Sequence, residues 1–187
     1  IRCWGNGANG KLGNGGTASQ NTPVSVTGIT NAVQLTLGHS HGCALIDDGT
    51  IECWGDGTNA RMGDGTSNVT NSTSVTVSGI TNAIQVIAGY AHTCALLDDA
   101  TMKCWGNNSV GQLGTGASGA TQDSPVVSSV ASSVSYVSVG GDTTCVILND
   151  GSSECWGEGS TGELGDTTTV DNLAAQAVSG ISNSAKQ

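Results

Sequence analysis

The sequence has no Phe, only 2 Pro, and just 5 Lys+Arg among its 187 residues. Against 15 Asp+Glu, so few basic side chains give a formal net charge of −10 at pH 7 and leave no basic stripe to neutralise phosphates. We therefore exclude nucleic acid and an anionic membrane surface as partners. No apolar run reaches the roughly 18 residues that a membrane-spanning helix needs, so we expect no membrane insertion.

Glycine is abundant, with 29 residues, and cysteine and tryptophan recur at a fixed spacing. The tripeptide Cys-Trp-Gly occurs four times, at intervals of 50, 51 and 51 residues, and a second cysteine series at 43, 94 and 145 keeps the same period. A repeat of this length indicates copies of one supersecondary unit. We place the units at 6–55, 56–106 and 107–157, with an incomplete fourth at 158–187, within a single partial domain that covers 1–187.

Each unit has the pattern of short β-strands. Its apolar residues alternate in segments that are rich in β-branched side chains and bounded by Gly, Asn, Asp or Ser. In the second unit the pattern predicts strands at 74–77, 83–88, 93–97 and 101–105, and no segment has the 3.6-residue period of a capped helix. Four antiparallel strands in about 50 residues predict an all-β fold of propeller blades, about 3.5 of them here.

One segment carries a family resemblance. Residues 83–96, with Gly89 before the His-Thr-Cys-Ala-Leu strand, are followed by Lys-Cys-Trp-Gly-Asn-Asn at 103–108 and by a Leu-Gly-Thr-Gly turn at 113–116. This string resembles one repeat of the regulator of chromosome condensation family, and the likeness extends in register along essentially the whole chain. The resemblance implies a seven-bladed β-propeller, of which this chain forms half a ring.

The cysteines of each unit are predicted to face each other across a hairpin. Pairing Leu45 with Ile51 leaves a three-residue loop at 47–49 and sets two cysteines opposite each other, about 4.5–5.5 Å apart at Cβ, which suits a disulfide. Buried reduced thiols are the alternative, whereas a zinc site is disfavoured because the spacing within each pair is too long. Three disulfides would favour an oxidising, extracellular or cell-surface location. The expected pairs are Cys43–Cys53, Cys94–Cys104 and Cys145–Cys155.

Two further features follow from this register. Cys3 has no partner strand before it, so we expect it to be unpaired or to bond another segment. In the second hairpin Ala100 replaces the turn glycine, so that turn is either strained or of another type.

The tryptophans each follow a cysteine and point to the opposite strand face, where we expect inter-blade packing. They are Trp4, Trp54, Trp105 and Trp156.

No residue pattern predicts catalysis, a cofactor or a metal site. His41 and His92 share one repeat position, which Thr143 occupies in the third unit, so packing is the expected role. The Asp residues at hairpin tips suit turns, with weak Ca²⁺ binding left open. Three asparagines fit the N-glycosylation acceptor pattern. They are Asn68, Asn71 and Asn107.

The resemblance does not carry the family's nucleotide-exchange or chromatin activity to this acidic half ring. Related secreted repeats act as rigid interaction scaffolds. We therefore expect a non-enzymatic extracellular propeller segment that binds a protein partner, or other copies of the chain, in an interaction or surface assembly. The alternatives are a carbohydrate-binding module with a glycan ligand and an enzyme inhibitor resembling the propellers that inhibit β-lactamases.

Overall fold

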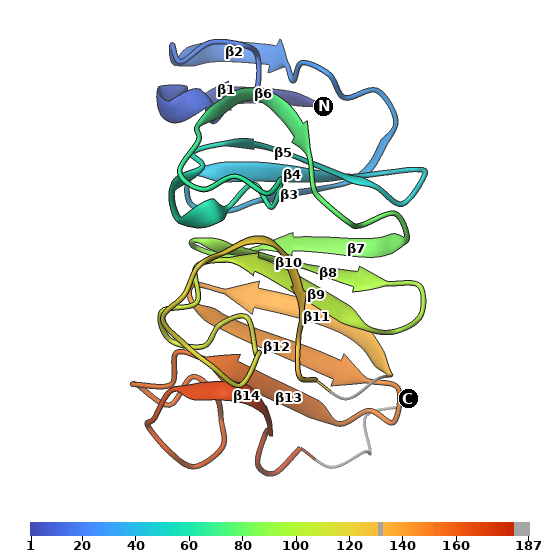
Figure 1. The fold of residues 1–187 in the computed structure, drawn as a ribbon, viewed down its shortest axis with the longest axis vertical. Helices are drawn as coiled ribbons and strands as arrows, with labels where there is room; N and C mark the ends of the chain where they lie inside the picture. The colour runs from blue at the N-terminus through green and yellow to red at the C-terminus, as the bar shows by residue number, and fades with distance from the viewer. Residues whose placement is uncertain (131–132, 182–187) are drawn as a thin grey trace.

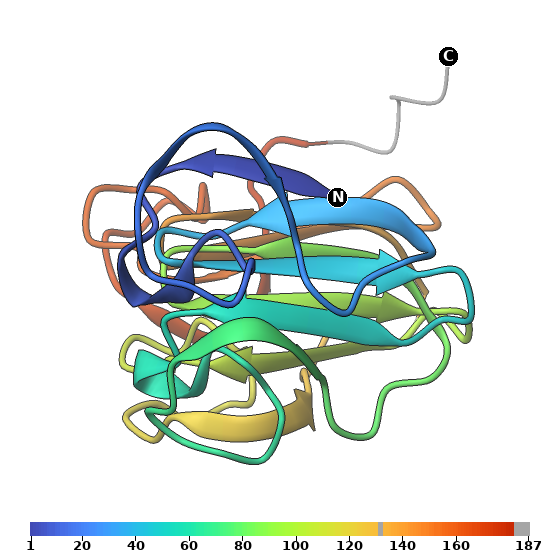
Figure 2. The same ribbon diagram turned by 90° about the horizontal axis from the view of Figure 1, so that it is seen from above.

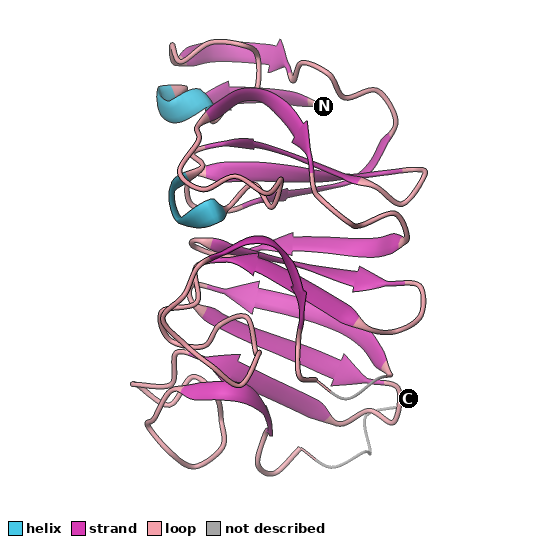
Figure 3. Ribbon diagram, in the orientation of Figure 1, coloured by secondary structure: helices cyan, strands magenta, loops and turns pink. Residues whose placement is uncertain are grey.

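The computed structural model of the chain describes residues 1–130 and 133–181. These residues form strands and two single-turn 3-10 helices, η1 (Ala8–Gly10) and η2 (Thr58–Ala60), as Figure 3 shows. The first strands are β1 (Arg2–Gly5), β2 (Gln20–Ser25), β3 (Ala32–Leu37), β4 (His41–Ile46), β5 (Ile51–Gly55), β6 (Asn71–Thr76) and β7 (Ala83–Ala88). The others are β8 (His92–Leu97), β9 (Met102–Gly106), β10 (Gln122–Val127), β11 (Val134–Gly140), β12 (Thr143–Leu148), β13 (Ser153–Gly157) and β14 (Asn172–Ala177).

The strands pair into antiparallel sheets that follow one another along the chain. We name the two-stranded sheet β1-β2 the half sheet, and the four-stranded sheets β3-β4-β5-β6, β7-β8-β9-β10 and β11-β12-β13-β14 the first, second and third sheets. Figure 1 shows them stacked in this order along the long axis of the molecule. The predicted all-β class and the four-stranded antiparallel blades are confirmed. The two-stranded half sheet corresponds to the half blade in the predicted total of about 3.5.

The sheets are offset from the sequence units. Each four-stranded sheet takes three strands from one unit and its fourth strand from the next, because β6 pairs with β5 and not with β7. Our assignment of four strands of one unit to one blade was therefore wrong, although the predicted strand at 83–88 has the observed bounds of β7. Residues 182–187, the end of the predicted fourth unit, lie outside the described residues.

The core lies between the sheets. One cluster joins Leu45 and Ile51 of the first sheet to Val86 and Trp105 of the second, all buried. The corresponding cluster one interface further joins Leu96 and Met102 to Val137 and Trp156. The second sheet thus packs one face against the first sheet and the other against the third.

In the second and third sheets, side chains from the preceding sheet add hydrogen bonds to the backbone of the first strand. The Gln34 Oε1 atom accepts from the Val86 backbone N–H at 2.9 Å. One repeat later, Gln85 accepts from the N–H of Val137 at 3.1 Å and donates to its carbonyl at 2.8 Å. These contacts fix β3, β7 and β11 side by side in a definite register.

Candidate interaction surface

Disulfides hold the two middle strands of each four-stranded sheet together. The structure joins Cys43 to Cys53, Cys94 to Cys104 and Cys145 to Cys155, with Cα atoms 4.1 Å apart in each pair. These are the pairs that the hairpin register predicts, and the observed strand pairing sets the same residues opposite each other. Each four-stranded sheet is therefore cross-linked by a disulfide beside the hairpin loop that it exposes at the surface.

Three of the four tryptophans fill the interfaces between sheets. Trp54, Trp105 and Trp156 are fully buried, and each indole N–H donates to a backbone carbonyl in the loop of the preceding sheet. The glycine of that loop has a positive φ and leaves no room for a side chain, since a Cβ on Gly63 would lie 2.7 Å from Trp105 Cδ1. The glycine-rich loops thus position the indoles. Trp4 departs from the prediction, because it is exposed and no sheet among the described residues covers its face.

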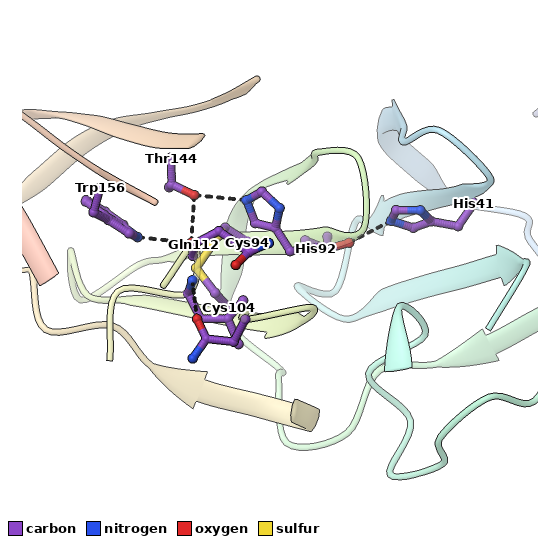
Figure 4. Close-up of a disulfide and its surroundings, with 10 residues drawn as sticks. His41, His92, Cys94, Cys104, Gln112, Thr144 and Trp156 are labelled. Atoms are coloured by element: carbon purple, nitrogen blue, oxygen red, sulfur yellow. Dashed lines mark hydrogen bonds between the residues drawn. A yellow bond between two sulfur atoms is a disulfide. The ribbon is translucent and has the colours of Figure 1, made fainter. Parts of the chain in front are cut away.

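A buried network connects the second and third sheets around Gln112 (Figure 4). The Gln112 carbonyl accepts from Thr144 Oγ1 at 2.9 Å and from Trp156 Nε1 at 3.0 Å, and the Gln112 side chain donates to Asp142. The Thr144 hydroxyl also contacts His92 Nε2 at 2.9 Å. Sequence reasoning missed Gln112 because its main interaction is made by a backbone carbonyl, which no residue pattern reveals.

The repeated histidines are structural. His41 Nε2 lies 2.8 Å from Thr93 Oγ1, which repeats the pairing of His92 with Thr144 one interface earlier. Burial lowers the pKa of His41 to about 3, with a smaller effect of the nearby Arg61 charge, and burial lowers the pKa of His92 to about 4. A histidine beside a hydroxyl resembles a base–nucleophile pair. Both threonines are completely buried, so no substrate reaches them.

Carboxylates line the tips of the disulfide-linked hairpins. Asp48 accepts hydrogen bonds from the Thr50 backbone N–H at 2.9 Å and hydroxyl at 2.6 Å, and Asp99 makes the same pair with Thr101. The threonine hydroxyl is the largest cause of the lowered pKa of each aspartate. Figures 1 and 2 show these tips at one end of the strands, opposite the end that carries η1 and η2. We call Asp47, Asp48, Asp98, Asp99 and Asp150 the acidic row.

An aromatic pair lies on the turns at the other end of the strands. The His39 and Tyr90 rings are stacked with centroids 4.3 Å apart, and both residues are exposed. The two residues hold the same repeat position on neighbouring sheets, where Gly141 stands in the third sheet.

The structure also bears on the metal, membrane and glycosylation predictions. Within residues 1–130 and 133–181, no group of three or more His, Cys, Asp or Glu side chains is placed to hold a metal ion. The described helices include none with the length and apolar character of a membrane span. Asn68 is exposed, whereas Asn71 and Asn107 are partly buried, and glycosylation of all three stays a prediction.

Comparison with known proteins identifies the repeat. The model of the regulator of chromosome condensation (RCC1) repeat matches residues 3–45 and 104–147, and a second model of the same repeat matches residues 83–112. The chain belongs to the RCC1 repeat family. The resemblance drawn from the sequence is thereby confirmed.

Relatives with RCC1 repeats are longer than this chain. The probable E3 ubiquitin-protein ligase HERC6 of Homo sapiens is 31% identical over 191 residues, which cover 97% of this chain and 19% of HERC6. The structure of human WBSCR16 superposes with a TM-score of 0.81 at 20% identity over 95% of this chain and 47% of its own. Prp20p of Saccharomyces cerevisiae, whose binding properties to Gsp1p and histones have been studied, gives 0.80 at 17% identity over 95% and 45%. These structures establish the RCC1 propeller fold, and the chain spans less than half of each.

Proposed function

We propose that the chain is a non-enzymatic RCC1 propeller segment that binds a basic protein partner through the acidic row. The observation that carries the proposal is the recurrence of carboxylates on one hairpin tip after another, each on a disulfide-linked strand pair. Asp48 and Asp99 are already fixed by their threonines in the free molecule, so little side-chain freedom is lost on binding.

Electrostatics favours a positively charged partner. The chain has a net charge of −10, and charges gathered on one face speed association with a surface of opposite sign. Structural neighbours with this fold include Prp20, a protein that was crystallised bound to Kap60. The three disulfides support an oxidising, extracellular location as part of the same proposal.

An Arg-Gly repeat peptide is the probe for a test by fluorescence anisotropy. Replacing Asp47→Asn and Asp98→Asn removes two charges from the acidic row and leaves the turn-forming Asp48 and Asp99 in place. We expect affinity to fall about 5–10-fold at low salt, and the difference to shrink as salt screens the charges.

The control carries the same net charge with the changes elsewhere. Asp123→Asn on β10 and Glu163→Gln in the loop before β14 are exposed and lie outside the acidic row. A loss of affinity equal to that of the acidic-row variant would show that only total charge matters and would reject the proposal. Linked peptides under non-reducing mass spectrometry test the disulfides separately.

A carbohydrate ligand is the second candidate, favoured by the exposed stack of His39 on Tyr90. Sugars pack their apolar ring faces on exposed aromatic rings. A glycan array separates the two functions, because binding lost in Tyr90→Ala but kept in the acidic-row variant would favour the sugar site over the protein site.

A further inference from the structure

A β-bulge near the start of the first strand in each four-stranded sheet turns one side chain out of the regular alternation. On β7, Ala83 and Gln85 pair with consecutive residues of β8, so Ile84 between them is the extra residue. The same register shift falls at Val33 of β3 and at Ser135 of β11. A bulge re-aims the side chain that it carries and is a common feature beside functional sites.

The exposure of Ile84 is a property of the repeat. Its sheet packs against the first sheet on one face and against the third sheet on the other, and Val86, two residues further along β7, is fully buried. Ile84 is nevertheless 57% exposed. Because both faces of the second sheet are covered, this exposure comes from the bulge and not from an uncovered face.

The bulged side chains line a groove of about 440 Å³ that crosses the three four-stranded sheets. Leu45 and Leu96, both buried apart from a small accessible area, form its wall beside Val33 and Ile84, and Ser135 continues it onto the third sheet. The first and second sheets thus each contribute one pair of aliphatic side chains. We name Val33, Leu45, Ile84 and Leu96 the tip groove.

The acidic row lies directly beside the tip groove. The Asp47 backbone N–H donates to the Asn31 carbonyl at 3.0 Å, and the Asp98 backbone N–H donates to the Asn82 carbonyl at 3.0 Å. Each asparagine comes two residues before the bulged residue of its sheet. The Asn82 side chain also donates to the Asp98 carboxylate, which holds this charge at the start of β7. Carboxylates and aliphatic side chains therefore lie next to each other once per sheet.

We propose that the acidic row and the tip groove together bind an amphipathic α-helix of the partner protein, which presents basic and aliphatic side chains in adjacent rows. The inference rests on the proposed binding of a basic partner and adds the conformation and the apolar contacts of that partner. Packed sheets lie about 10 Å apart, so the same pair of features recurs at this interval along the stack (Figure 1). Seven residues of an α-helix rise about 10.5 Å and return to nearly the same side of the helix.

An extended segment does not match this spacing. Its residues rise about 3.3 Å each and alternate between two faces, so residues about 10 Å apart point in opposite directions. On a helix, the residue four positions after a basic residue lies beside it on the same side. Arginine at every seventh position then faces Asp47 and Asp98, while leucine four residues later faces Val33 and Ile84. The net charge of −10 favours this arrangement of basic side chains over a purely apolar helix.

The probe is a helical peptide of about 18 residues in an Ala/Gln background, with Arg at every seventh position and Leu four residues after each Arg. In its control each Leu stands two residues after the Arg, on the opposite side of the helix, so that composition and charge are unchanged. Fluorescence anisotropy with the full chain should show the first peptide binding at least about tenfold tighter. Equal affinities would overturn the helix proposal, and salt-dependent binding of both peptides would then still support a basic partner.

The variant Ile84→Ser tests the groove in the protein. Serine occupies the same bulge position at Ser135, so the fold accepts it. We expect the variant to bind the amphipathic peptide about fivefold more weakly, and to bind the Arg-Gly repeat peptide, which has no apolar side chain, as tightly as the unchanged protein. Val127→Ser is the matched control, because this exposed valine lies on β10 at the opposite edge of the same sheet, and it should change neither affinity.

The acidic-row variant separates this inference from the proposed function on which it rests. Asp47→Asn with Asp98→Asn should weaken the binding of both peptides, because both use the carboxylates. If the acidic-row variant loses affinity while Ile84→Ser binds the amphipathic peptide like the unchanged protein, the helix proposal is overturned and the basic partner stands. If neither variant weakens binding, both proposals are rejected.

Discussion

The turn of the second hairpin shows how one residue can depart from the repeat without a change of fold. Ala100 has φ of 62°, in the left-handed region that Gly49 and Gly151 occupy in the other two hairpins. The sequence left two outcomes open, strain or another turn type, and the structure keeps the turn with a non-glycine residue in it. A left-handed residue with a Cβ is less stable than glycine by roughly 1–2 kcal/mol.

Replacing this alanine should stabilise the protein. We expect Ala100→Gly to raise the free energy of unfolding by about 1 kcal/mol, measured by urea denaturation. The reverse change, Gly151→Ala, is the matched control, because a Cβ there meets no atom within 4 Å and only the positive φ opposes it. It should lower stability by a similar amount, and a destabilised Ala100→Gly variant would contradict the backbone argument.

Gly38 illustrates a second residue-scale constraint. A Cβ on Gly38 would lie 2.3 Å from the imidazole Cε1 of His41 and 2.6 Å from the Gly89 carbonyl oxygen, whereas a Cβ on Gly140 would meet nothing within 4 Å. We expect Gly38→Ala to destabilise the protein by about 1–3 kcal/mol through overpacking, and Gly140→Ala to be nearly neutral. Thermal unfolding of the two variants decides the point, since equal shifts would mean that neither the His41 ring nor the Gly89 carbonyl requires the glycine.

Elements are joined across sheets by the two buried histidines, and this connection depends on pH. In the folded protein burial lowers the pKa of His41 to about 3 and that of His92 to about 4, while an unfolded histidine titrates near 6.5. The unfolded chain therefore binds protons first as the pH falls. Stability should be complete above about pH 6.5 and decline toward pH 4, by up to about 2.7 kcal/mol per pH unit for the two groups together.

Urea denaturation between pH 7 and pH 4.5 measures this slope. The neutral variant His41→Gln/His92→Gln should flatten it. Carboxylates with a lowered pKa, such as Asp48, Asp99 and Glu163, act in the same direction from about pH 5 downward, so the slope between pH 7 and pH 5 is the one that reports the histidines. A slope that persists in the double variant would assign the pH dependence to other groups.

The pairing of a strand could be predicted from the sequence where its partner is the next strand of the same hairpin, and not where the partner is chosen by packing between sheets. The pairing of Cys43 with Cys53 followed from alternation and loop length, because both strands belong to one hairpin. The assignment of β6 failed because its choice between β5 and β7 is made by tertiary packing, which alternation does not encode. The stack of His39 on Tyr90 was likewise unpredictable, since it depends on the spacing between neighbouring sheets.

At the scale of the whole molecule, stability resides in the interfaces between successive sheets, as in other linear repeat arrays. An internal sheet is covered on both faces, and the half sheet on one. The predicted packing role therefore holds for Trp54, Trp105 and Trp156 and fails for Trp4, although all four have the same local sequence. Local sequence sets which side chain points out of the sheet, and only the neighbouring sheet decides whether it is buried.

This difference can be measured by comparing two identical substitutions. Trp105→Ala removes a fully buried indole and its hydrogen bond to the Arg61 carbonyl, so we expect a loss of about 3–5 kcal/mol. Trp4→Ala removes an exposed indole and should cost less than about 1 kcal/mol. Acrylamide should quench the Trp4 share of the fluorescence first, and amides of β1 should exchange hydrogen faster than those of β9. Equal losses for the two variants would mean that the half sheet is as well packed as the interior, and that stability does not follow the number of covered faces.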